Sequence, residues 1–147
     1  MSDILEKLAN GVVCESLEST NAVALSFAQV AGGDFSVALS GGLGAGKTAF
    51  VKCLARAKGI TQKVKSPSFN ICCVYDIPSG GKLVHVDAYR FADGARFEDL
   101  LLDEIAPSPR ILCVEWAEIV ADYFKPDYWL DFDIRGNAHT IKLRKLA

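Results

Sequence analysis

The residues best suited to chemistry in this chain form one glycine-rich stretch. It reads Leu39-Ser40-Gly41-Gly42-Leu43-Gly44-Ala45-Gly46-Lys47-Thr48 and fits the pattern G-x-x-x-x-G-K-[ST] at every fixed position. The glycines Gly41, Gly42 and Gly44 allow positive φ angles, so successive backbone N–H groups can turn toward phosphate oxygens. Lys47 places a positive charge beside the β and γ phosphates, and Thr48 offers a hydroxyl to Mg²⁺. The stretch therefore predicts a site for a nucleoside triphosphate.

The segments on either side of this loop supply the elements that such a site needs. Residues 35–39 form an apolar run that predicts a strand, and residues 48–57 carry a helical pattern directly after Gly46. The free amide groups and positive dipole end of that helix would face the same phosphates. The alternative is a glycine-rich turn before an ordinary helix, which the order of strand, loop and helix disfavours.

Two acidic residues at the ends of predicted strands could complete the site. Residues 69–75 and 82–87 flank a turn and predict an antiparallel hairpin whose second strand ends at Asp87. Residues 110–116 are an apolar run with Glu115 near its end, as in a buried parallel strand that carries a metal-side acid. Either acid can hold Mg²⁺ while the other orients or deprotonates an attacking water.

Several residues near these motifs have both a functional and a structural interpretation. Ser66 and Ser68 lie in the polar run 61–68, which is either a loop that senses the γ-phosphate or a solvated connection. For Asp87, the structural interpretation is a salt bridge to Arg90 in place of a role in catalysis. His85 is expected to be a hydrogen-bonded core residue rather than a ligand or base. Trp116 is expected to pack in the core, although an exposed indole could serve a partner surface.

Composition describes a globular protein without a strong charge bias. The chain has 147 residues, 50% of them hydrophobic, and its 16 basic and 18 acidic residues give a net charge of −2. This predicts one domain over residues 1–147 with enough apolar chain for a core. It also excludes binding to nucleic acid or an anionic membrane through bulk charge, so any link to RNA has to be local or through a partner.

Cysteine usage and the first residues indicate the compartment. Five cysteines, at positions 14, 53, 72, 73 and 113, lie in apolar surroundings and show no CxxC spacing. We expect them to be reduced core residues of a cytoplasmic protein. The chain lacks the basic start and apolar run of a signal peptide, and no stretch has the length of a membrane span.

The remaining segments predict the elements around the site. Polar residues from Ser16 to Thr20 can cap a helix that follows them. The acidic segment from 91 to 109 is amphipathic, with apolar side chains on a helical spacing and a solvated charged face. Further elements are a strand over 11–15, a helix over 21–28, a short helix over 117–124, and a hairpin of strands over 128–134 and 139–144. We expect an α/β, P-loop NTPase-like three-layer fold with a mixed parallel and antiparallel central sheet flanked by helices.

Charged residues alternate with apolar ones on both strands of the C-terminal hairpin. Asp131 and Asp133 lie on the first strand, and Lys142 and Arg144 lie on the second. Cross-strand charge pairs explain these four residues better than a metal site does.

Four motifs in this order resemble those of the TsaE (YjeE) family, whose members are bacterial P-loop ATPases that help to make threonylcarbamoyladenosine in tRNA. The match runs from about Ser19 to Glu118. The motifs are the loop Gly42 to Thr48, the segment Val64-Lys65-Ser66-Pro67-Ser68-Phe69, His85-Val86-Asp87-Ala88-Tyr89-Arg90 and Val114-Glu115-Trp116-Ala117-Glu118. Two positions differ from the family pattern, since Gly42 stands where Asp is usual and Ser68 where Thr is usual.

The resemblance implies ATP and Mg²⁺ as cofactors and assigns roles to particular residues. Thr48 and Glu115 would bind the metal, Lys47 would bind phosphate, and Asp87 and Glu115 would be the residues needed for hydrolysis. The segment that includes Thr20 would lie near the nucleotide base. The positions implied to contact ATP are Thr20, Gly42, Leu43, Gly44, Ala45, Gly46, Lys47, Thr48 and Ala49.

The resemblance also implies partners and a task. The partners would be the TsaB and TsaD proteins, with TsaC supplying the threonylcarbamoyl adenylate, and tRNA would be contacted only indirectly. The ATPase would reset the TsaB–TsaD complex between turnovers rather than transfer the carbamoyl group, and hydrolysis would be slow without partners.

Two other functions fit the same loop. A small P-loop kinase for a nucleotide or metabolite would share the loop and the Mg²⁺ chemistry, but residues 91–110 are too acidic for an arginine-rich lid. A nucleotide-gated binding module would need no hydrolysis, so substitution of Asp87 or Glu115 would leave its function intact. The chain has no N-K-x-D motif for reading guanine, which favours ATP over GTP.

Overall fold

A single mixed sheet organises the computed structural model, which describes residues 3–64, 72–91 and 94–146. Within those residues the sheet has seven strands in the order β1-β7-β6-β2-β5-β4-β3. The strands are β1 (Val12–Cys14), β2 (Phe35–Gly41), β3 (Cys72–Asp76), β4 (Lys82–Asp87), β5 (Arg110–Glu115), β6 (Tyr128–Arg135) and β7 (Ala138–Leu143). The α-helices are α1 (Asp3–Asn10), α2 (Leu17–Ala31), α3 (Lys47–Ala57) and α4 (Leu102–Ile105), and the 3-10 helices are η1 (Ala88–Arg90), η2 (Gly94–Leu100) and η3 (Ala117–Val120).

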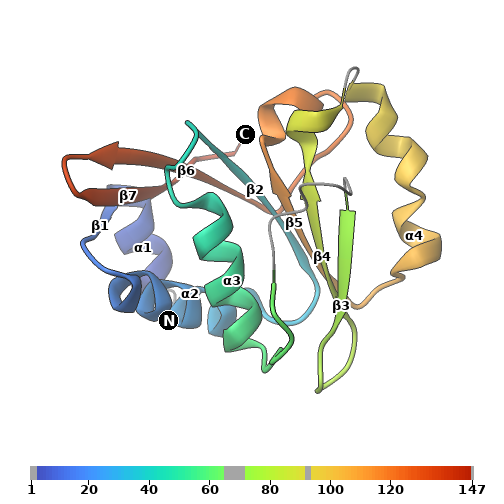
Figure 1. The fold of residues 1–147 in the computed structure, drawn as a ribbon, viewed down its shortest axis with the longest axis horizontal. Coiled ribbons are helices and arrows are strands. Elements are labelled where there is room, and N and C mark those ends of the chain that lie inside the picture. Colours follow the sequence, from blue (N-terminus) through green and yellow to red (C-terminus); the bar gives the residue numbers. More distant parts are fainter. Residues whose placement is uncertain (1–2, 65–71, 92–93, 147) are drawn as a thin grey trace.

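The order and direction of the strands bring the carboxyl ends of β2, β4 and β5 together. Strand β2 lies between β5 and β6 and runs parallel to both, and β4 runs parallel to β5. The hairpins β3–β4 and β6–β7 are antiparallel, and β1 adds to β7 at one edge (Figure 1). The glycine-rich loop of residues 41–48, named the phosphate loop for its expected ligand, follows β2. Asp87 and Glu115 end β4 and β5, so the loop and both acids reach the same edge of the sheet.

Each face of the sheet is covered by its own apolar cluster. Side chains alternate along buried strands, so Val37 and Leu39 of β2 join one cluster while Ala38 joins the other. The first cluster holds α1, α2 and α3 against the sheet, and its rings Phe27 and Phe50 meet edge to face at 6.0 Å. The second cluster lies beneath η1, η2 and η3. The expected three-layer α/β fold with a mixed sheet is confirmed.

The acidic segment from 91 to 109 differs from the expected amphipathic helix. Its described part is the 3-10 helix η2 followed by the single turn α4, and Leu101 between them has a φ of 52°. Leu101 is 55% exposed and Ile105 is 45% exposed, so the helical spacing wrongly assigned both to the buried face. The left-handed residue interrupts the helix, and the spacing of apolar residues cannot reveal such a break.

Other segments differ less from the expected elements. The sequence does not predict α1, and α2 is longer than predicted because it begins directly after Ser16, whose hydroxyl accepts the N–H of Ser19. The helix expected over 117–124 is the 3-10 helix η3, which ends at Val120. Both expected hairpins are present, although the first residues of the 69–75 strand, before Cys72, lie outside the described residues.

The cysteines agree in part with the expectation that they are core residues. The thiols Cys14, Cys53 and Cys113 are free and buried, whereas Cys72 and Cys73 on the edge strand β3 are free but only half-buried. No helix in the described parts of the chain is both long enough and apolar enough to cross a membrane.

Charged side chains pair across the C-terminal hairpin at Asp131. Arg144 donates two hydrogen bonds to its carboxylate, at 2.6 and 3.0 Å, and Ser40 of β2 donates a third at 2.6 Å. Burial raises the pKa of Asp131, but the hydrogen bonds from Arg144 and Ser40 outweigh it and hold that pKa below its ordinary value. Asp133 instead accepts the backbone N–H of Ile134 at 2.9 Å.

Candidate functional site

The backbone of the phosphate loop depends on glycine at three positions. Gly41, Gly44 and Gly46 have φ angles of 141°, 77° and 104°. A Cβ atom on Gly41 would lie 2.3 Å from the backbone oxygen of Phe132 on β6, so no side chain fits there. Gly42 has no positive φ, and a Cβ added to it would meet nothing within 4 Å. The expectation that Gly42 turns the backbone is therefore wrong.

Lys47, the first residue of α3, is buried at the centre of the loop. Its Nζ atom donates to the carbonyl oxygens of Gly41 at 2.6 Å and Gly42 at 2.9 Å, and lies 4.2 Å from the ring centroid of Trp116. Burial lowers the pKa of Lys47, and the carboxylates of Glu115 and its neighbours act in the opposite direction. The ammonium group is thus held by acceptors of the loop itself.

Thr48 and Glu115, the two residues expected to bind the metal, are in direct contact. The Thr48 hydroxyl lies 2.9 Å from Oε1 and 2.8 Å from Oε2 of Glu115, which is buried at the end of β5. A hydroxyl and a carboxylate are oxygen donors of the kind that Mg²⁺ prefers. Among the described residues, no group of three or more His, Cys, Asp or Glu could hold a metal ion. A Mg²⁺ ion here would take its remaining ligands from phosphate oxygens and water.

Asp87 lies beside this pair. Parallel pairing of β4 with β5 places Asp87 opposite Glu115, and Asp87 Oδ1 accepts the backbone N–H of Tyr89 at 3.1 Å. The alternative of a salt bridge to Arg90 falls on a side chain that lies outside the described residues, as do Ser66 and Ser68. The two strand-end acids therefore share one edge of the site, as expected from their positions in the sequence.

His85 is a buried, hydrogen-bonded histidine, as the sequence predicts, although only one of its ring nitrogens has a partner among the described residues. Its Nε2 atom lies 2.5 Å from Oε2 of Glu115, whereas its Nδ1 atom has no hydrogen-bond partner among the described residues. The histidine is therefore in direct contact with the Glu115 carboxylate.

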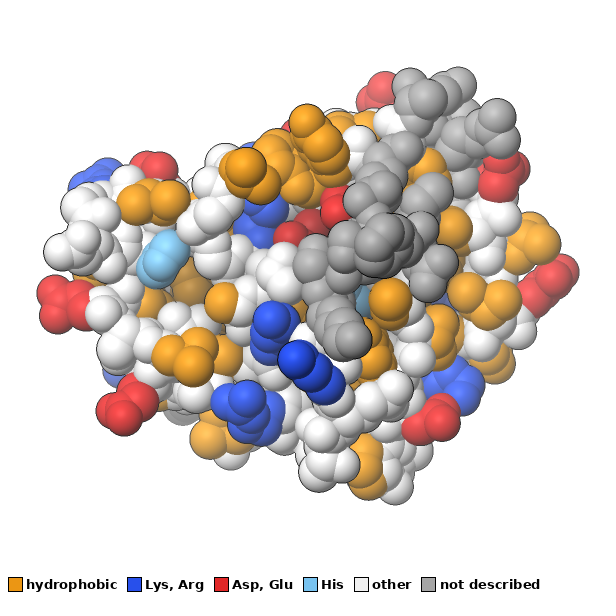
Figure 2. All heavy atoms as spheres, in the orientation of Figure 1, with side chains coloured by type: hydrophobic (Ala, Val, Ile, Leu, Met, Phe, Trp, Pro, Cys, Tyr) orange, Lys and Arg blue, Asp and Glu red, His pale blue; other side chains and the backbone are white. Residues whose placement is uncertain are grey.

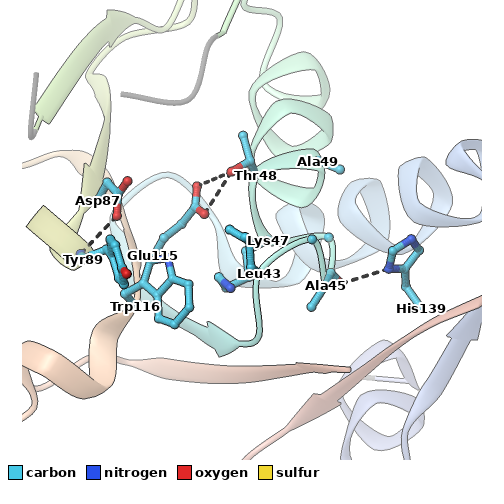
Figure 3. A pocket seen from close by; sticks show the side chains of 12 residues that line it. Leu43, Ala45, Lys47, Thr48, Ala49, Asp87, Tyr89, Glu115, Trp116 and His139 are labelled. Carbon is cyan, nitrogen blue, oxygen red and sulfur yellow. Dashed lines mark hydrogen bonds between the residues drawn. The ribbon is translucent and has the colours of Figure 1, made fainter. Parts of the chain in front are cut away.

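Trp116 packs against the second apolar cluster, as expected, and also forms a wall of the site. It has a φ of 58°, and its ring lies against Tyr89 with the centroids 4.9 Å apart. Figure 3 shows this ring between the β4 and β5 strand ends and the loop. The left-handed turn after Glu115 points the indole toward Lys47 instead of into the sheet.

Two adjoining cavities run along the loop. The first has a volume of about 560 Å³ and is the one seen in Figure 3, on a face where acidic and basic side chains meet in a hollow (Figure 2). It is lined by Leu43, Gly44, Ala45, Gly46, Lys47, Thr48, Ala49, Asp87, Tyr89, Glu115, Trp116 and His139. The second, of about 220 Å³, includes Thr20 and shares Gly46, Ala49 and His139 with the first. Most predicted site residues are therefore contiguous, whereas Gly42 does not line either cavity and its carbonyl oxygen accepts from Lys47 and from the backbone N–H of Ala45.

His139 is a site residue that sequence reasoning did not predict. It lies on β7, and its Nδ1 atom is 3.0 Å from the carbonyl oxygen of Ala45 in the loop. A histidine among alternating residues of a hairpin carries no signal for such a contact, because the partner lies 94 positions earlier in the chain.

The fold and this site define an α/β protein of the P-loop NTPase-like class. The family described as "Threonylcarbamoyl adenosine biosynthesis protein TsaE" matches residues 14–145. The chain is 39% identical over 114 residues to the tRNA threonylcarbamoyladenosine biosynthesis protein TsaE of Aquifex aeolicus, covering 76% of this chain and 80% of that protein. For the protein of the same name from Treponema pallidum the identity is 38% over 101 residues, covering 67% and 71%.

A solved structure agrees with these sequence matches. The crystal structure of Bacillus subtilis YdiB has a TM-score of 0.68 and 29% sequence identity, over 90% of this chain and 82% of that chain. The chain therefore belongs to the TsaE family of threonylcarbamoyladenosine biosynthesis proteins.

Proposed function

We propose that this protein binds ATP with Mg²⁺ and hydrolyses it, as the ATPase component of the cytoplasmic machinery that makes threonylcarbamoyladenosine in tRNA. The observation that carries the proposal is the meeting of Lys47, Thr48 and Glu115 in one cavity. These groups supply the positive charge and oxygen ligands that a triphosphate and its metal require. Membership of the TsaE family supports the link to tRNA modification.

The loop would bind the phosphates through its backbone N–H groups and Lys47. Carbonyl oxygens of Gly41 and Gly42 accept from the ammonium, and phosphate oxygens are stronger acceptors for it because they are charged. We therefore expect Lys47 to exchange these carbonyls for the β and γ phosphates. Thr48 and Glu115 would hold Mg²⁺, which neutralises charge on the phosphate oxygens when it is bound.

Asp87 would orient or deprotonate the attacking water. It lines the same cavity as Thr48 and Glu115, and the backbone N–H of Tyr89 fixes the position of its Oδ1 atom. The second carboxylate oxygen can then accept a proton or a hydrogen bond from water. A general base in this role contributes a rate factor of about 10²–10⁴.

The mouth of the cavity is suited to a protein partner, which we propose is the TsaB–TsaD complex. Leu43 and Tyr89 stand at the rim and are 88% and 64% exposed. Apolar side chains grouped at the mouth of a polar site are typical of a surface that a partner covers. A cover of this kind would exclude water from the phosphates, so hydrolysis is expected to be slow without it. Contact with tRNA would then be through the complex.

ATP turnover by the purified protein, with and without a TsaB–TsaD complex from the same source, tests this proposal. We expect slow turnover alone, stimulation by the complex, and a loss of at least tenfold in Asp87→Asn. The matched control is Asp122→Asn, which removes an exposed acid outside the cavity. ATP binding without stimulation by the complex would contradict the partner assignment, and phosphate transfer to a small acceptor would favour the kinase alternative.

A further inference from the structure

The basic residues of this chain are unevenly distributed along it. Six of its 16 basic residues and none of its 18 acidic residues lie in the stretch 35–75, although the whole chain has a net charge of −2. That stretch contains α3 and the segment after it. Figure 2 shows basic side chains gathered over this part of the fold, on the face that also carries the hollow of the site. One part of the surface is therefore positive on a protein whose net charge is negative.

Three of these basic side chains line one groove, which we call the basic groove. Lys52 and Arg56 lie one turn apart on α3, and Lys63 lies in the segment that follows; together they line a cavity of about 500 Å³. All three residues are exposed, and no acid is among the described residues that line the cavity. Lys82 and Arg110 each form a salt bridge with an acid, whereas within the described parts of the chain the three residues of the groove form none. The groove therefore presents positive charge that the fold itself does not neutralise.

We infer that the basic groove binds an extended, acidic segment of the protein partner that covers the site. This inference rests on the proposed function, since it concerns the docking of the partner proposed there. Helix α3 begins at Lys47 beside the phosphate loop, so Arg56 lies about 14 Å further along the helix axis. A partner seated over the mouth of the site can thus reach the groove with a neighbouring segment.

The spacing of the charges fits an acidic segment in an extended conformation. Lys52 and Arg56 are separated by about 6 Å along the axis of α3. In an extended chain, alternate side chains point to the same side and stand about 7 Å apart. Acids at alternate positions of such a segment can therefore each meet one of these two cations. Complementary charges at the edge of an interface increase the rate of association and select the partner.

A nucleic acid fits the same groove less well. Single-stranded RNA is bound by a basic channel with aromatic side chains on which the bases stack. The described lining of the groove has three cations and no aromatic ring. The net charge of −2 also opposes the approach of a long polyanion, whereas a short acidic segment carries only a few charges. The groove therefore favours a protein segment over RNA.

Reversal of charge in the groove tests the inference. The variant carries Lys52→Glu and Arg56→Glu, and its matched control carries Lys7→Glu and Lys125→Glu, which change the net charge equally at exposed positions outside the groove. ATP turnover is measured against increasing concentrations of the TsaB–TsaD complex from the same source, at low and at high NaCl concentration. Binding of tRNA to each protein is measured separately, and thermal unfolding checks the fold.

We expect the reversal to raise the concentration of complex needed for half-maximal stimulation by about tenfold or more at low salt, with unstimulated turnover unchanged. High salt should raise the wild-type value toward that of the variant, because salt screens exposed charges. The control should behave like the wild type.

Two results would overturn the inference and leave the proposed function intact. One is stimulation of the folded variant at the wild-type concentration of complex, or an equal loss in the control. The other is loss of tRNA binding in the variant with stimulation unchanged, which would assign the groove to RNA. Failure of the complex to stimulate the wild type would instead overturn the proposed partner, and this inference with it.

Discussion

His85 and Glu115 form a buried contact at the base of the site, with Nε2 of the histidine 2.5 Å from Oε2 of the carboxylate. The other ring nitrogen has no partner among the described residues. A buried polar atom without a partner costs about 1–3 kcal/mol. His85 and Thr48 contact the same carboxylate, that of Glu115. We therefore interpret His85 as a positioning residue that holds the Glu115 carboxylate toward Thr48.

Substitution of His85 should weaken the response to Mg²⁺. Loss of a group that orients a metal ligand typically costs about 10–100-fold in metal affinity or activity. We expect His85→Ala to raise the Mg²⁺ concentration for half-maximal ATP turnover by at least tenfold, and His85→Gln, whose amide can still donate to Glu115, to recover part of the loss. Reduced stability with an unchanged Mg²⁺ dependence would instead assign His85 to packing.

Glu115→Gln should separate metal binding from nucleotide binding. The amide oxygen can still accept from Thr48, but the negative charge that attracts Mg²⁺ is gone. We expect turnover to fall by about 100-fold at fixed Mg²⁺ and ADP binding in EDTA to stay unchanged. Glu118→Gln is the control, because it removes an exposed acid three residues away. Equal losses in both variants would mean that general charge, rather than this ligand, matters.

Two adjacent glycines of the loop should differ in their tolerance of a side chain. A Cβ atom on Gly41 would meet the Phe132 backbone oxygen at 2.3 Å, whereas one on Gly42 meets nothing within 4 Å. We expect Gly41→Ala to lower the free energy of unfolding by about 2 kcal/mol or more, because backbone cannot move aside as a flexible side chain can. Gly42→Ala should change it by about 0.5 kcal/mol or less. Urea unfolding of both variants measures the difference, and similar values would refute it.

Asp131 should stabilise the fold at neutral pH and lose that effect in acid. Its pKa in the folded protein lies below the ordinary value of 3.8, so the ionised form is favoured by folding. The contribution is therefore complete above that ordinary value and disappears as pH falls through the folded pKa. Since the side chain is partly exposed, we expect Asp131→Asn to cost only about 1 kcal/mol at pH 7.

The comparison of pH 7 with pH 3 tests this linkage. The difference in unfolding free energy between wild type and Asp131→Asn should shrink at pH 3, measured by urea unfolding. Asp133→Asn is the control on the same strand, because Asp133 bonds only to the adjacent backbone among the contacts described above. A difference that is equal at both pH values would show that shape, not ionisation, accounts for the effect.

The sequence by itself determined the local parts of this protein. The phosphate loop between a strand and a helix, the two hairpins, and the acids at the ends of β4 and β5 all follow from patterns within short stretches. Glycine spacing, turn residues and alternation act on the backbone near them, so neighbouring residues suffice to predict the result. The prediction of an amphipathic helix over residues 91–109 was wrong because one left-handed residue, Leu101, divides the segment.

The tertiary structure alone decided which distant residues meet. Thr48 contacts Glu115 across 67 positions, and His139 reaches Ala45 across 94, because β5 and β6 lie on either side of β2 and β7 follows β6. Periodicity along a strand states which face is buried but not which strand lies beside it. For the same reason the contact of His85 with Glu115 could not be predicted, since the register between two parallel strands is set by packing of the whole sheet.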